Sequence, residues 1–112
     1  MSYIYTFIRQ DISPEQRIVQ IGHACYEAGK MFRDNLGISS LILLPAKNEV
    51  EIKSIIRQLD RRGIEHYAFF EPDDNVLTGK TMGYSAICTR PIMDDERERA
   101  FFRKWELFVH TD

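Results

Sequence analysis

Four polar side chains at helical spacing are the first place in the chain where chemistry is visible. Gln16, Gln20, His23 and Lys30 follow one another at intervals of four, three and seven residues. On a helix these intervals place all four on one side. Histidine exchanges a proton near neutral pH, glutamine holds a substrate group or a water, and lysine meets a phosphate or a developing oxyanion. The same pattern is also typical of an ordinary solvated helix face, so both interpretations stay open here.

The segment that carries these residues, 13–34, begins with a clear helix start. Ser13 is a suitable N-cap, Pro14 suits the first helical position, and Gln16 completes a capping box with the serine. Residues 35–37 are expected to end the helix, with Gly37 in a left-handed conformation. An apolar stripe at spacings of three and four predicts the face that packs on the core. Its members are Ile18, Ile21, Cys25, Ala28 and Phe32.

Length and composition indicate one ordinary globular domain spanning residues 1–112, with 44% hydrophobic and 29% charged residues. The net charge of −2 argues against broad, non-specific nucleic-acid binding. A local basic patch stays open, and its candidates are Lys30, Arg33, Arg57, Arg61 and Arg62. We see no apolar stretch long enough for a membrane span and no secretory leader, so we expect a cytoplasmic protein. Cys25 and Cys88 are expected to be core thiols in a reducing compartment.

The order of apolar patterns predicts a β-α-β-α-β-β-α chain. Strands are expected at residues 3–9, 40–44, 64–70 and 81–89, and helices at 13–34, 48–62 and from Asp94 or Asp95 to about 103. Asn48 is the expected N-cap of the second helix, with Glu51 in a capping-box position. Residues 71–80 read as an acidic loop, and residues 105–108 as an extended tail. Three aromatic side chains near the end of the chain are expected to cover either the core or the partner in a homodimer, namely Phe101, Phe102 and Trp105.

Two helical crossovers link the first three predicted strands and make them parallel, while the short link to the fourth permits an antiparallel strand. The sequence therefore predicts an α/β fold, a mixed four-stranded sheet with helices on both faces. Because ligands of open α/β sheets bind at the carboxyl ends of the strands, the polar helix face and the acidic loop are expected to share one cleft. His23, Cys25, His66, Cys88 and Asp73 include metal-ligand types, but no pair has zinc-motif spacing, so we expect no metal or cofactor.

The opening strand and the segment RQDISPEQRIVQIGHACYEAGK resemble the type 2 peptidyl-tRNA hydrolases of archaea and eukaryotes. That family has a strand, a turn after Arg-x-Asp, and a helix with Gln-x-x-His-Ala and a lysine seven residues after the histidine. Arg9 and Asp11 fit the first motif loosely. The second motif is matched with correct spacing by Gln20, His23, Ala24 and Lys30. The resemblance implies a three-layer α/β/α domain whose last-added strand is antiparallel.

The resemblance also implies an activity, hydrolysis of the ester between a peptide or amino acid and the 3′ end of tRNA. His23 would activate or position the water, Glu71 would orient it, with Asp73 as the alternative acid, and Gln20 would hold the carbonyl side. Lys30 would meet phosphate or the oxyanion. Gln16, Thr78 and Thr81 are further expected substrate contacts, and tRNA is the expected partner.

Two departures from the family pattern favour a second hypothesis. Gln16 stands where those enzymes usually carry a lysine, and Glu71-Pro72-Asp73-Asp74 replaces an Asp-Ala-Gly-Arg-Thr-Gln type of loop. An acidic loop repels RNA unless it is aimed at water or at a substrate amine. The chain thus looks like a divergent bacterial or viral branch of the superfamily. The alternative function is a non-catalytic module that binds RNA or a protein partner.

Overall fold

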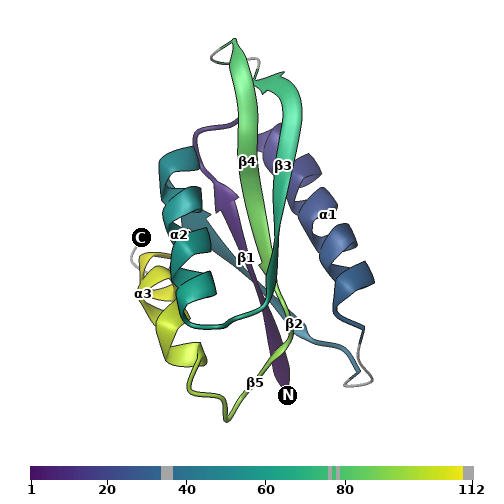
Figure 1. Ribbon diagram of the computed structural model, residues 1–112, viewed down its shortest axis with the longest axis vertical. Coiled ribbons are helices and arrows are strands. Elements are labelled where there is room, and N and C mark those ends of the chain that lie inside the picture. Colours follow the sequence, from purple (N-terminus) through teal and green to yellow (C-terminus); the bar gives the residue numbers. More distant parts are fainter. Residues whose placement is uncertain (34–36, 76, 78, 110–112) are drawn as a thin grey trace.

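A mixed β-sheet organises the chain. The computed structural model describes residues 1–33, 37–75, 77 and 79–109. Its main strands lie in the order β2–β1–β4–β3 (Figure 1). Strand β1 (Ser2–Arg9) pairs in parallel with β2 (Ser40–Ala46), whereas β4 (Lys80–Thr89) is antiparallel to both β1 and β3 (His66–Asn75). Three strands therefore run in one direction and β4 runs against them.

Helices pack on both faces of this sheet. Helix α1 (Pro14–Met31) lies on one face, where Ala24 and Ala28 meet Ile8 and Cys88. Helices α2 (Glu49–Arg61) and α3 (Arg99–Val109) lie on the other, as Figure 1 shows. This arrangement confirms the predicted α/β class. No helix within the described residues is long and apolar enough to cross a membrane.

Both predicted N-caps form, since each satisfies a backbone N–H that has no partner within the helix. The Ser13 hydroxyl accepts a hydrogen bond from the Gln16 N–H at 3.2 Å, and the Asn48 side chain accepts one from the Glu51 N–H at 3.0 Å. The Gln16 side chain does not return to Ser13, however, and instead accepts a hydrogen bond from Gln20. The first turn of α1 is thereby tied to its second turn.

The C-terminal third differs from the prediction. A short strand β5 (Ile92–Met93) pairs with β1, which gives the described sheet five strands instead of four. Helix α3 starts at Arg99, not at Asp94 or Asp95, and continues through residues 105–108, so the expected extended tail is wrong. The aromatic side chains explain this, because Phe101, Phe102 and Trp105 share one helical face and are all buried in the core of a single chain.

Two further boundaries differ for local reasons. Pro45 does not end β2 but lies inside it, opposite Ile8, which is possible because β2 is an edge strand. Residues 71–75 and 80 extend β3 and β4 into a longer hairpin instead of forming a loop. Helix α1 already ends at Met31, and Gly37 has the expected positive φ of 81°. Residues 35 and 36 of the predicted helix stop lie outside the described residues.

Helix α1 is also rotated relative to the predicted stripe. Ile21, Cys25 and Phe32 of that stripe pack against the core, but Ile18 is 73% exposed, and the buried residues of α1 are Gln20, Ala24 and Ala28. These three recur every four residues and define the true inner face. A polar side chain therefore occupies a core position while an apolar one faces out, which is a pattern that needs a specific explanation.

Gly83 sets how closely the start of α2 approaches β4. Its φ is 72°, and a Cβ built there would lie 1.9 Å from the Glu49 Oε2 atom. That oxygen accepts a hydrogen bond from the Tyr84 N–H at 2.8 Å. Any side chain at residue 83 would therefore have to displace the carboxylate that satisfies the next backbone N–H.

We predict that Gly83→Ala destabilises the protein more than Gly63→Ala does. Gly63 is the matched control, because its φ of 69° is similar and nothing lies within 4 Å of its added Cβ. The control should lose about 1 kcal/mol of unfolding free energy from backbone strain, and Gly83→Ala about 1 kcal/mol more from the lost hydrogen bond. Urea unfolding measures both. In a Glu49→Ala background the two glycine substitutions should lower the unfolding free energy by the same amount. If Gly83→Ala still costs more by the same margin, the clash with Glu49 is not the cause.

Candidate functional site

Two irregularities in the β3–β4 pairing shape one end of the hairpin. Phe69 pairs with Ala86 and Phe70 with Tyr84, so Ser85 is an extra residue without a partner on β3. Further along, Glu71 pairs with Gly83 and Asp74 with Thr81, which leaves an extra residue on β3 at Pro72–Asp73. Bulges of this kind redirect side chains and are frequent beside functional sites. Glu71 stands between the two.

The first bulge turns the Ser85 hydroxyl toward α1, where it meets Gln20. The Ser85 Oγ donates a hydrogen bond to the Gln20 Oε1 at 2.6 Å. The Gln20 amide nitrogen donates to the Gln16 Oε1 at 3.3 Å and to the Glu71 Oε2 at 3.1 Å. Both amide N–H groups and the carbonyl are thus engaged, which explains how a 0% exposed glutamine is tolerated on the inner face of α1.

The Glu71 carboxylate is held at both of its oxygens. Its Oε2 accepts from Gln20, and its Oε1 accepts from the Asp73 backbone N–H at 3.1 Å. Both donors are neutral. The second bulge, which contains Pro72, brings the Asp73 N–H back to this oxygen. The result is a fixed, half-buried carboxylate whose two hydrogen bonds come from neutral donors.

His23 lies one turn after Gln20 and covers the same strand. Its ring stacks on Phe69, with ring centroids 4.6 Å apart and an angle of 9° between the planes. Phe69 is two residues before Glu71 on β3, so α1 presents Gln20 over Glu71 and His23 over Phe69. His23 is exposed, and no described residue forms a hydrogen bond or ion pair with its ring nitrogens. The imidazole is therefore positioned by stacking, with its nitrogens open to solvent or substrate.

On the opposite face of the sheet, Arg9 and Glu49 bind backbone groups of β4 next to the bulge at Ser85. Glu49 accepts the hydrogen bond from the Tyr84 N–H. Arg9 is 6% exposed and donates from Nη1 to the carbonyls of Met82 and Tyr84. Its Nε and Nη2 atoms donate to the two oxygens of Asp11, each at 2.8 Å. The hydrogen bond from Arg9 lowers the pKa of the Asp11 carboxyl below its usual range. The Arg-x-Asp pair at the end of β1 thus helps to hold the bulge.

The side chains of Lys30, Asp73 and Thr81 do not join this cluster. Lys30 pairs with Glu27 at 3.0 Å in the last turn of α1, about 10 Å along the helix from His23. Asp73 contributes its backbone N–H, while its side chain is exposed. Thr81 lies exposed on the hairpin opposite Asp74. Thr78 lies outside the described residues.

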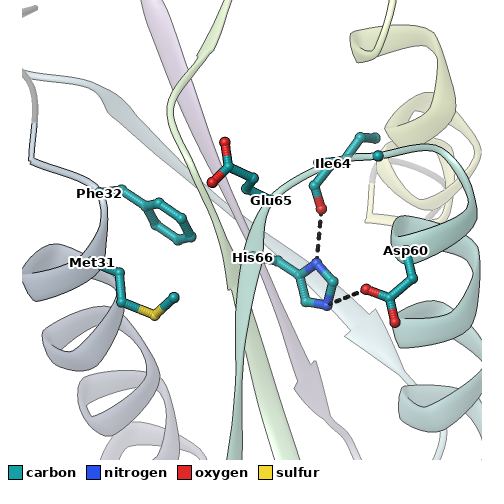
Figure 2. A pocket seen from close by; sticks show the side chains of 7 residues that line it. Met31, Phe32, Asp60, Ile64, Glu65 and His66 are labelled. Carbon is teal, nitrogen blue, oxygen red and sulfur yellow. Dashed lines mark hydrogen bonds and ion pairs between the residues drawn. The ribbon is translucent and has the colours of Figure 1, made fainter.

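A cavity lies at the other end of β3, between the end of α1 and the turn after α2. It measures about 330 Å³ and is lined by residues that include Phe32, Asp60 and His66. Figure 2 shows the His66 ring held between the Ile64 carbonyl, 2.8 Å from Nδ1, and Asp60, 3.8 Å from Nε2. No group of three or more His, Cys, Asp or Glu side chains in the described part of the chain is arranged to hold a metal ion.

Ser85 is the site residue that the sequence did not reveal. Strand alternation assigns each residue of β4 to one face, and only a bulge brings the Ser85 hydroxyl and the Ala86 methyl to the same side. A serine within the mostly apolar run of residues 82–88 is the one available signal.

The chain matches no model of a known protein family and no curated protein.

We predict strong energetic coupling between Gln20 and Ser85. Ser85→Ala leaves a buried carbonyl oxygen without its donor, and Gln20→Leu leaves a buried hydroxyl and the Glu71 Oε2 without partners. Each should cost about 1–3 kcal/mol of unfolding free energy. The double variant should cost less than the sum by about 1 kcal/mol or more. Ser54→Ala, which removes a hydroxyl bonded to Gln58 on α2, is the control and should add to Gln20→Leu. Additive costs for Gln20 and Ser85 would contradict this arrangement.

Proposed function

We propose that this protein is an ester hydrolase of the type 2 peptidyl-tRNA hydrolase kind, acting on the bond between an acyl group and the 3′ end of tRNA. The observation that carries the proposal is the hydrogen bond between Gln20 and Glu71, 51 residues apart in sequence. It supports the idea that the Gln-x-x-His face of α1 and the acidic end of β3 form one site. The mixed sheet with an antiparallel fourth strand is also the fold that the resemblance implies.

In this proposal His23 acts as the general base. A neutral imidazole takes a proton from water, and the hydroxide attacks the ester carbonyl. The tetrahedral intermediate then collapses, the bond from the carbonyl carbon to the ribose 3′ oxygen breaks, and the imidazolium returns its proton to that oxygen. Stacking on Phe69 fixes the plane of the ring during both transfers.

Glu71 supplies the negative charge that favours the imidazolium or orients the attacking water. Both of its oxygens are held by neutral donors, so these hydrogen bonds leave its negative charge in place. Gln20 acts as a positioning residue, since its amide is fully engaged within the protein and leaves no N–H for a substrate carbonyl. Gln16, which is half-buried beside it, is then the better candidate for contact with the acyl group.

RNA would be held mainly through phosphates and its single-stranded 3′ end. Lys30 is exposed at the far end of α1 and is a candidate for such a phosphate contact. The hydrogen bond from Lys30 to Glu27 raises the pKa of the lysine, so the ammonium is charged throughout the neutral range.

We predict that the purified protein releases the acyl group from acyl-tRNA and that His23→Ala lowers kcat/KM at least 100-fold. Because His23 is exposed, Tm should stay close to that of the unchanged protein. His66→Gln is the matched control, since His66 lies at the other end of β3, and it should retain activity. Released amino acid or peptide is measured directly.

The same experiment tests the alternative, a non-catalytic binding module on this fold. The exposed acidic side chains of Asp73 and Asp74 favour the protein-binding form of that alternative, because they repel RNA phosphates. No turnover together with salt-dependent tRNA binding would replace the hydrolase proposal with an RNA-binding module. Neither turnover nor tRNA binding would point to a protein partner.

A further inference from the structure

Two thiols from distant parts of the chain meet between α1 and the sheet. Cys25 is on α1 and Cys88 is on β4, and both sulfurs lie against the hydroxyl of Thr6 on β1. The distances from the Thr6 Oγ1 are 3.7 Å to the Cys25 Sγ and 3.6 Å to the Cys88 Sγ. Thr6 and Cys88 are direct partners across β1 and β4. The three side chains therefore form one compact group on the inner side of α1.

Small side chains allow α1 to come close to the strands at this point. Ala24 and Ala28 flank Cys25 on the helix, and their exposed fractions are 0% and 4%. A side chain with more atoms at either position would hold the helix further from the sheet. The close approach places the Cys25 sulfur directly above β1 and β4.

A cavity of about 230 Å³ reaches both thiols. It is lined mainly by apolar side chains, among them Ile4, Phe32 and Leu41, with Cys25 and Cys88 in its wall. Cys25 is half-buried and Cys88 is buried, so the two thiols differ in their access to solvent. A small uncharged oxidant can therefore reach Cys25 first.

The two thiols also differ in acidity. A hydrogen bond from Cys88 lowers the pKa of Cys25 to about 6, with help from Thr6 and against the effect of burial. The same contact with Cys25, together with burial, raises the pKa of Cys88 far above its ordinary value. These shifts favour the thiolate at Cys25 and the thiol at Cys88, which is the division of roles that a dithiol needs for oxidation.

We propose that Cys25 and Cys88 form a peroxide-sensitive dithiol that closes to a disulfide between α1 and β4. The Cys25 thiolate attacks one oxygen of hydrogen peroxide, the O–O bond breaks, and Cys25 sulfenic acid and hydroxide form. The Cys88 sulfur then attacks the Cys25 sulfur, the S–O bond breaks, and the Cys88 proton leaves with the oxygen as water. The peroxide is reduced and the two thiols are oxidised by two electrons in total. A thiol reductant reverses the change by exchange.

The disulfide would fix α1 to the sheet two residues after His23. Its formation requires neither tRNA nor hydrolysis, so the inference stands independently of the proposed function.

The experiment treats the full-length protein with stoichiometric hydrogen peroxide and analyses its peptides by mass spectrometry without reduction. We expect a Cys25–Cys88 cross-linked peptide that dithiothreitol removes. In Cys88→Ser, the sulfenic acid at Cys25 should persist and be trapped by a 1,3-dione reagent. In Cys25→Ser, Cys88 should remain reduced. The rate of Cys25 alkylation by iodoacetamide should rise as pH passes through about 6, and Thr6→Val should slow it at neutral pH.

Three results would overturn the proposal. One is a reduced Cys25 after peroxide treatment of the folded protein. Another is oxidation of Cys25 to the sulfinic acid with Cys88 still free. The last is a disulfide that joins two molecules instead of Cys25 and Cys88 of one chain. Circular dichroism of each variant before treatment verifies that the protein is folded.

Discussion

The buried amide of Gln20 is the constraint on which the candidate site depends. A primary amide withdrawn from water must have its N–H groups and its carbonyl bonded, or the fold loses about 1–3 kcal/mol for a group left unpaired. Ser85, Glu71 and Gln16 meet that demand from three different segments. The amide thereby fixes the rotation of α1 and the position of the hairpin end relative to it. The bulge in β4 follows from the same requirement, because a regular strand would turn the Ser85 hydroxyl away.

The opposite face of the sheet supports the same bulge with charged groups. The buried Arg9 side chain serves two carbonyls of β4 and is itself held by Asp11, while Glu49 takes the Tyr84 N–H. Backbone groups that lost their strand partners are thus satisfied from β1 and α2. The irregularity is therefore stable, and Glu71 is held rigidly between two bulges. In the proposed function, this rigid carboxylate and the stacked imidazole of His23 would together activate water.

Much of the fold could be predicted from the sequence because its signals are local. Ser13 and Asn48 cap the two helices as predicted, and the apolar runs locate the strands. The rotation of α1 could not be predicted, because Ile18 is the more hydrophobic residue and only a long-range partner explains why Gln20 is inside. The sequence places Trp105 in an extended tail after the helix that carries Phe101 and Phe102, whereas the structure continues the helix through it. Of the site, the sequence predicts that the polar side of α1 lies near the acidic segment, but the part played by Ser85 depends on a bulge that alternation cannot indicate.

The position at which a substrate mimic binds tests the proposed site most directly. Amide-linked 3′-aminoacyl-adenosine, which cannot be hydrolysed, is titrated into the ¹⁵N-labelled protein while backbone amide shifts are followed. We expect the largest changes in amide chemical shift at Gln16, His23, Glu71 and Asp73. The cavity beside Phe32 and His66, which begins roughly 16 Å along β3 from Glu71, should stay unperturbed. Shifts confined to that cavity, or none at saturating mimic, would contradict the assignment of the site.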